Sequence, residues 1–187
     1  ILSSKTTQIA NRQSSSGETI CSSDGKHYEK RVDAKGHESD SVCIEGEIPF
    51  EIPDSWEWVR LNQLAWFGGG HTPSTSDKDN YTSKGILWVT SKDMKRDYID
   101  DTQIQLTEKG AEKLYRYQPG TVLMVTRSGI LRKLLPVAML AKEATVNQDQ
   151  KAIVPFLLDI SDWIMTYLKA NDAYIRKEFG KAGTTVE

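Results

Sequence analysis

The sequence predicts an α/β fold of the α+β class: a compact mixed sheet with flanking helices, preceded by a small β-arm. Short apolar runs rich in β-branched residues recur between turn residues, as strands do. Residues 161–180 carry apolar side chains at helical spacing. Strands and helices are interspersed, without the tandem strand–helix–strand order of a doubly wound sheet.

The chain has 187 residues, of which 38% are hydrophobic and 27% charged, as in globular proteins with polar segments. No apolar run approaches the roughly 18 residues that a membrane helix needs, and the polar residues 1–17 do not resemble a signal peptide. Cys21 and Cys43 fit a reducing cytoplasm, and a single disulfide between them is the alternative. We expect a cytoplasmic protein with no membrane partner. Because it begins with Ile1, we expect a fragment or a processed chain.

The first part of the chain is expected to hold little core. Residues 1–19 are rich in Ser, Thr, Gln and Asn, as in a flexible tail or linker. Residues 20–46 contain Asp24-Gly25 between two short runs, which predicts a hairpin and hence a β-arm. The main domain is expected to cover residues 47–187.

Within the main domain, Trp56 and Trp58 are expected to anchor the core near its start, because large aromatic side chains bury well. Residues 67–85 form a polar, Gly-rich loop, and Thr107 provides a cap for a helix. Further strands are expected within residues 86–94, at Val122–Val125, as a pair within residues 134–146 and within residues 147–158; a helix capped by Ser161 or Asp162 should run to about Gly180.

The usual signatures of enzymes and metal sites are missing from the sequence. Ser128 lies in Thr-Arg-Ser-Gly-Ile, which is not the Gly-x-Ser-x-Gly of a nucleophile elbow. The histidines and cysteines lack the short spacings of zinc ligands. The stretch GGGHTPS lacks the Lys-Ser/Thr ending of a phosphate-binding loop. We therefore predict no catalytic residue, no metal ligand and no cofactor bound by this chain.

Charge is distributed unevenly along the chain. Residues 1–60 hold 7 Lys/Arg and 11 Asp/Glu, a net charge of −4. Residues 113–151 hold 7 Lys/Arg and 2 Asp/Glu, a net charge of +5. A local field of this sign favours an anionic partner, because salt screens more distant charges. A solvated basic surface is the alternative.

Strands of the main domain end in short polar clusters. These clusters contain Arg, Lys, Asn, Gln, Ser and Thr, the residue types that read base edges or hold phosphates in DNA complexes. Ordinary turn chemistry is the better explanation of each cluster taken singly, and only the four clusters together with the basic segment make DNA binding an equal alternative. The clusters lie at residues 72–75, 90–92, 126–128 and 147–151.

Seven motifs resemble, in order, a target recognition domain of the specificity subunit of type I restriction–modification systems. Each motif is weakly specific, and their common register over roughly residues 20–187 carries the resemblance. They are EIPFEIPDSWEWVRL (47–61), GGHTPS (69–74), GILWVTSKDM (85–94), LTEKGAEK (106–113), GTVLMVTRSGILRK (120–133), ATVNQDQKAIVP (144–155) and AGTTVE (182–187).

The resemblance implies a non-catalytic module that recognises one half of a split, double-stranded DNA target. Modification subunits would bind S-adenosylmethionine and methylate adenine, and an ATP-driven restriction subunit would join them. The family continues beyond the Gly-Thr-Thr motif, so the resemblance implies a domain truncated at its C-terminal side. Two alternatives stay open: the recognition portion of a fused restriction–methyltransferase enzyme, and a protein-interaction module.

Arg127 is expected to point at DNA from a loop on a basic face, and pairing with an acid such as Asp149 is the alternative. The resemblance implies a phosphate contact for Arg127, because Arg-Ser-Gly recurs among readers of different targets. Base choice is then expected in residues 71–78 and 92–96 and at Arg132-Lys133. The predicted DNA-binding residues are His71, Thr72, Ser74, Lys78, Ser91, Lys92, Lys95, Arg96, Arg127, Ser128, Arg132, Lys133, Asn147, Gln148 and Lys151.

Overall fold

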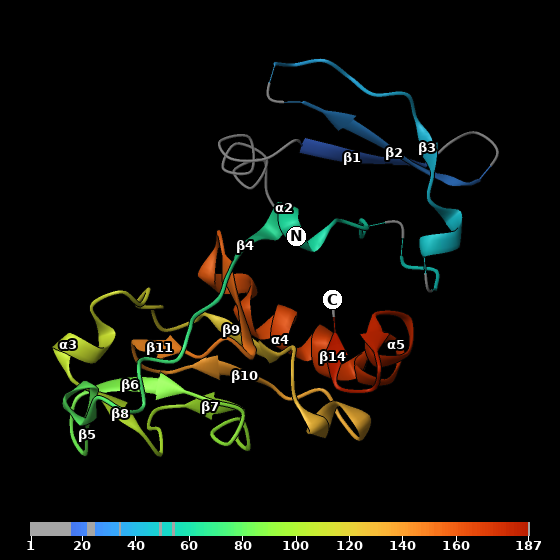
Figure 1. Ribbon diagram of the computed structural model, residues 1–187. Coiled ribbons are helices and arrows are strands. Elements are labelled where there is room, and N and C mark those ends of the chain that lie inside the picture. The colour runs from blue at the N-terminus through green and yellow to red at the C-terminus, as the bar shows by residue number, and fades with distance from the viewer. Residues whose placement is uncertain (1–15, 22–24, 34, 49, 54, 187) are drawn as a thin grey trace. The chain divides into compact units, whose positions relative to one another are not determined.

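The computed structural model describes residues 16–21, 25–33, 35–48, 50–53 and 55–186. The chain divides into two compact units, residues 1–66 and residues 67–187 (Figure 1). Residues 1–15 of the predicted tail lie outside the described residues, and β1 begins at Ser16. The boundaries predicted at residues 19/20 and 46/47 stay predictions.

The first unit contains an antiparallel sheet with the strand order β1-β2-β3. Cys21 of β1 faces His27 of β2 in the register, and Gly25 in the connection has a φ of 76°. The hairpin predicted from Asp24-Gly25 is thereby confirmed. The unit also contains a 3-10 helix, η1, and one turn of α-helix, α2. The bounds are β1 Ser16–Cys21, β2 His27–Val32, β3 Val42–Cys43, η1 Glu45–Glu47 and α2 Leu61–Leu64.

A buried carboxylate ties the β-arm to the segment that leads into α2. Glu29 of β2 is 5% exposed, and its two oxygens accept hydrogen bonds from Arg60 Nε at 3.2 Å and Nη2 at 3.0 Å. Arg31 Nη2 donates to the same carboxylate at 2.9 Å, and Arg60 also pairs with Glu47. The Arg60 guanidinium lowers the pKa of Glu29, with Arg31 assisting, so Glu29 stays ionised although it is buried.

The second unit is built around two mixed sheets. One has the strand order β4-β12-β9-β10-β7 and the other the order β11-β6-β8-β5. The strands are β4 (Ala65–Gly68, in which the division between units falls), β5 Tyr81–Thr82, β6 Ile86–Val89, β7 Tyr98–Ile99, β8 Gln105–Leu106, β9 Val122–Val125, β10 Val137–Leu140, β11 Ala144–Val146, β12 Gln150–Pro155, β13 Gly180–Lys181 and β14 Thr185–Val186.

Short helices flank the sheets. Figure 1 shows α3 and α5 on opposite sides of the second unit, with α4 beside the sheet strand β9. α4 packs on β10 and β9 through Ile164, Met165 and Leu168, which are buried. The helices are η2 Lys78–Asn80, α3 Glu108–Ala111, η3 Gly129–Arg132, η4 Leu158–Ile160, α4 Ser161–Ala170 and α5 Asp172–Glu178. Among the described residues, none forms a helix with the length and apolarity that crossing a membrane requires.

The central strands are buried on both faces, which explains their unbroken apolar sequences. Val122, Leu123 and Val125 of β9 are fully buried, as are Ala138 of β10 and Ile153 of β12. The mixed α+β class and the strand Val122–Val125 are thus confirmed. Thr107 caps α3 as predicted, accepting from the Gly110 amide at 3.1 Å.

Four expectations about the main domain are wrong. The two strands within residues 134–146 exist, but β10 pairs with β9 and β7, whereas β11 pairs with β6. The final helix is interrupted at Asn171, whose side chain donates to the Tyr167 carbonyl and competes with the helical pattern. Neither Ser161 nor Asp162 caps α4, which has Ile160 at the N-cap position. Trp56 is 59% exposed and anchors no core.

Candidate nucleic-acid interface

The turn Asn147–Asp149 joins β11 to β12 and lies at the centre of the predicted site. Its own side chains hold it: Asn147 Nδ2 donates to Asp149 Oδ2 at 3.0 Å, and the Asp149 amide donates to Asn147 Oδ1 at 3.1 Å. Asn147 is 6% exposed. Because Asn147 is buried as well as bonded at both Nδ2 and Oδ1, its predicted DNA contact would require the turn to open.

The segment after β9 is fastened to this turn through the main chain. The Asp149 carbonyl accepts from the Thr126 amide at 2.8 Å and from the Arg127 amide at 3.4 Å. The Asp149 carboxylate is used by Asn147, and Arg127 forms no ion pair within the described part of the chain. The two segments are therefore held together, but by main-chain bonds and not by the Arg127–Asp149 ion pair that was the alternative. The Arg127 side chain is exposed to solvent.

The loop that contains His71 and Thr72 crosses the end of β11. A Cβ placed on Gly70 would lie 1.7 Å from the Val146 carbonyl oxygen, so only glycine permits this approach. Thr72 Oγ1 donates to Gln148 Oε1 at 2.8 Å, which joins the loop to the central turn. His71 and Gln148 are exposed beside this contact.

Two tyrosine hydroxyls donate to main-chain carbonyls of the same loop. Tyr117 donates to the Gly69 carbonyl and Tyr81 to the Pro73 carbonyl, each at 2.8 Å. Burial raises the pKa of both phenols, so both stay protonated and able to donate. Among the predicted residues of this loop, Ser74 contacts the Ser76 hydroxyl at 2.8 Å.

The segment after β6 also begins at the central turn, because the Asn147 amide donates to the Val89 carbonyl at 3.1 Å. Asp93 shapes this segment by accepting from the Thr90 amide and hydroxyl, each at 2.8 Å. Ser91 is half-buried, and Lys92 is exposed. The segment continues past the buried Met94 through the exposed Lys95 and Arg96 into β7, which pairs with the C-terminal half of β10.

The segment between β9 and β10 starts beside the central turn, where Thr126 bonds to Asp149, and then leads away from that turn. Ser128 caps η3 by accepting from the Ile130 amide at 3.4 Å, so its hydroxyl has a local role. Arg132 and Lys133 end this helix and are exposed. Arg132 lies against Gly183, where a Cβ would be 3.4 Å from its Cγ atom.

Most of the predicted cationic side chains form no ion pair with another described residue. Among the described residues, only Arg96 of this set has an ion pair, with Asp100 at 3.5 Å. Lys151 lies on β12 opposite Met124, close to the origin of the Arg127 segment. The cations without such a pair are Lys78, Lys92, Lys95, Arg127, Arg132, Lys133 and Lys151, all exposed.

The structure thus joins parts of all four predicted polar clusters, at residues 72–75, 90–92, 126–128 and 147–151, at one edge. Contacts to the central turn are not found for Lys78, Lys95 or Arg96 among the described residues. The sequence reasoning missed the residues that build the frame, above all Gly70, Asp93 and Tyr117. The Gly-Gly-Gly run was a usable signal for a close backbone approach.

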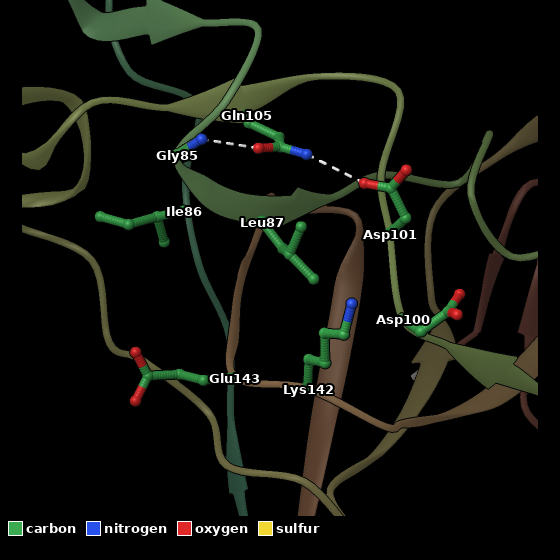
Figure 2. Close-up of a pocket in the computed structure, with 8 residues that line it drawn as sticks. All are labelled: Gly85, Ile86, Leu87, Asp100, Asp101, Gln105, Lys142 and Glu143. Atoms are coloured by element: carbon green, nitrogen blue, oxygen red, sulfur yellow. Dashed lines mark hydrogen bonds between the residues drawn. The ribbon is translucent and has the colours of Figure 1, made fainter.

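A pocket of about 420 Å³ opens at the other end of β11. Figure 2 shows Lys142 directed into it beside Leu87, and Gln105 bridging the Gly85 amide and the Asp101 carboxylate. The acids and the lysine there are open to solvent. Within the described residues, no group of His, Cys, Asp and Glu side chains is arranged to hold a metal ion.

Comparisons with known proteins agree on one family. The chain is 31% identical over 133 residues to the EcoR124I/EcoR124II type I restriction enzyme specificity subunit of Escherichia coli, covering 70% of this chain and 33% of that one. It is 31% identical over 110 residues to the MjaIX type I specificity subunit of Methanocaldococcus jannaschii, covering 56% and 24%. No family model matches the chain.

Two solved structures match part of the chain. The HsdS subunit from Thermoanaerobacter tengcongensis has a TM-score of 0.48 at 17% identity, over 66% of this chain and 30% of that one. A chain from a type I R-M system, described for its complex assembly and conformational transition, has a TM-score of 0.52 at 17% identity, over 74% and 32%. The second likeness supports the fold.

The present chain spans about one third of the first curated relative and about one quarter of the second. The chain belongs to the family of type I restriction enzyme specificity subunits, as a target recognition domain of that family.

Proposed function

We propose that this chain recognises one half of a split DNA target and thereby directs adenine methylation and restriction by partner subunits, without catalysing either reaction. The observation that supports this most is the turn Asn147–Asp149, which fastens three other strand-end segments around it. Exposed cations and amides extend from this rigid edge, as sequence-reading proteins require.

The partners and cofactors follow from the same proposal. Modification subunits would bind S-adenosylmethionine, and a restriction subunit would use ATP, so this chain needs neither. A cytoplasmic location stays a prediction. The chemistry of the described site is that of recognition, because it offers guanidinium, ammonium, hydroxyl and carboxamide groups but no paired nucleophile and base.

A salt titration tests the electrostatic part of the proposal. Binding of the chain to random duplex DNA should weaken log-linearly with salt concentration, with a slope of about −0.9 for each phosphate contacted. Arg127→Gln and Lys92→Ala should each reduce that slope by about 1. Lys142→Ala is the matched control, because Lys142 is an exposed cation at the opposite end of β11, and it should leave the slope unchanged.

Methylome sequencing tests the sequence-reading part. A host that expresses the intact gene with its partner subunits should methylate one split motif. Exchanging residues 71–78 or 92–96 for those of another family member should alter one half of that motif and leave the other half intact. An unchanged motif would show that these loops do not choose bases. Binding that is insensitive to salt and needs no DNA would instead favour a protein partner.

A further inference from the structure

We propose that Thr72 is a positioning residue for Gln148. Its hydroxyl occupies the Gln148 amide carbonyl, so that Gln148 presents its two N–H hydrogens to a hydrogen-bond acceptor on DNA. That acceptor is either a base-edge atom or a phosphate oxygen. This inference deepens the proposed function and rests on it.

The contact itself fixes the direction of the hydrogen bond. Thr72 Oγ1 lies 2.8 Å from Gln148 Oε1, and the two residues are 76 positions apart in the sequence. The carbonyl oxygen has no hydrogen, so the hydroxyl is the donor. Gln148 is exposed, and its Nε2 group has no partner among the described residues. The free end of the amide is therefore a donor that faces solvent.

Thr72 is held on a rigid frame. The neighbouring Gly70 lies against the Val146 carbonyl so closely that a Cβ would be 1.7 Å from its oxygen. On the other side, Pro73 is buried and its carbonyl accepts from the Tyr81 hydroxyl at 2.8 Å. The position of Thr72 between these two contacts is set by the fold and needs no ligand.

Gln148 is held on the opposite side by the turn in which it lies. The preceding residue, Asn147, donates its amide to Val89, and its side chain closes the turn on Asp149. Both partners of the Thr72–Gln148 bond are thus in place before any DNA arrives. A side chain that is already ordered loses little conformational entropy on binding, which strengthens and sharpens recognition.

The orientation decides what Gln148 can recognise. Reading adenine requires one amide to accept from N6 and donate to N7 at the same time. The carbonyl oxygen can accept two hydrogen bonds, but the bond from Thr72 turns it toward the loop and leaves the Nε2 donor pair as the group offered to a ligand, which suits guanine O6 or N7, thymine O4 or a phosphate oxygen. Adenine N6 and cytosine N4 are donors and would meet N–H with N–H.

A double-mutant cycle tests the coupling. Duplexes are first selected from a random pool with the full 187-residue chain. The affinity for these duplexes is then measured for four variants: Thr72→Val, Thr72→Ser, Gln148→Met and the Val/Met double variant. Thr72→Val should weaken binding about three- to tenfold, since one neutral hydrogen bond is lost. Thr72→Ser, which keeps the hydroxyl, should bind as the unaltered chain does.

In the Gln148→Met background, Thr72→Val should cause no further loss, because Thr72 acts through Gln148. An equal loss in both backgrounds would overturn the proposal and indicate a direct role of Thr72. The selected sequences separate the two sources of acceptor. If Gln148→Met removes a preference for guanine or thymine at one position, the acceptor is a base, and if it weakens all sequences equally, the acceptor is a phosphate. A lost preference for adenine or cytosine would overturn the proposal.

A measurement without DNA separates this inference from the proposed function. The side-chain ¹⁵N–¹H signals of Gln148 should shift in Thr72→Val and stay in place in Thr72→Ser, with melting temperatures confirming that each variant is folded. Unchanged signals in folded Thr72→Val overturn the inference while leaving DNA recognition intact. Failure of the unaltered chain to bind any duplex overturns both.

Discussion

Gly70→Ala is the substitution for which the structure makes the most definite prediction. A Cβ at this position would lie 1.7 Å from the Val146 carbonyl oxygen and 2.6 Å from its carbon. Real Cβ atoms essentially never come within 3.0 Å of a heavy atom outside their own residue and its chain neighbours. The loop and the end of β11 must therefore separate by at least about 1.3 Å. Both partners are main chain, so no side-chain rotation relieves the clash.

The displacement is large enough to break the contact that follows. The hydrogen bond from Thr72 to Gln148 measures 2.8 Å, and hydrogen bonds are lost beyond about 3.5 Å. Strain from overpacking costs about 1–3 kcal/mol, and a lost neutral hydrogen bond costs about 1 kcal/mol. Replacing glycine returns about 0.4–1 kcal/mol through the unfolded chain. We expect a net loss of about 1–3.5 kcal/mol in the free energy of unfolding.

Urea unfolding followed by near-ultraviolet circular dichroism measures this loss, and DNA binding of the same variant reports on the loop. Gly129→Ala is the matched control, because a Cβ there meets no heavy atom within 4 Å and its φ is not positive. It should lie within about 0.5 kcal/mol of the unaltered chain. If Gly70→Ala is equally harmless, or if the two substitutions are equally damaging, the close approach at Gly70 does not constrain the loop.

Three further predictions concern groups around the sheets and the arm. Gln150→Met should raise the free energy of unfolding by about 1 kcal/mol in urea, because both polar atoms of the buried Gln150 amide lack a partner among the described residues; a loss would reveal a hidden partner. Tyr117→Phe should cost about 1 kcal/mol by removing the hydroxyl that donates to Gly69, and the same melts measure it. Glu29→Gln should weaken protection of β2 amides from hydrogen exchange by about 2 kcal/mol at neutral pH, since Arg60 loses a charged acceptor but keeps Glu47. Because the folded-state pKa of Glu29 lies below its ordinary value of 4.5, this difference should be full above pH 4.5 and vanish as the pH falls through the folded value; a constant difference would contradict the ion-pair account.

Features of the fold that depend on local sequence could be predicted. The Pro119-Gly120 pair, a turn signal in any sequence, forms a turn before β9, with Gly120 at a φ of 87° that only glycine adopts without strain. The apolar run that follows it forms β9 at the predicted residues. Strand pairing could not be predicted, because β10 and β11 are close in sequence and yet join different sheets through partners elsewhere in the chain.

The candidate site shows the same division. Polar clusters at strand ends could be found from composition, but their roles depend on contacts that sequence spacing does not encode. Asn147 resembled a base reader and is instead closed within its own turn, and Ser128 caps a helix. Thr72 and Gln148 meet only because the loop after β4 crosses the end of β11. Residue type therefore indicated the region, and tertiary structure decided which side chains face solvent.

This arrangement separates a frame from the side chains that it presents. Main-chain bonds of Val89, Thr126 and Asp149 hold the central turn, so the frame does not depend on the identity of the exposed residues beside it. Exposed positions such as His71 and Lys92 can therefore change with little effect on folding, typically within about 0.5 kcal/mol. A recognition domain built in this way can acquire a new target by substitution at its exposed edge, because the main-chain bonds that hold the central turn do not involve the side chains that would contact DNA.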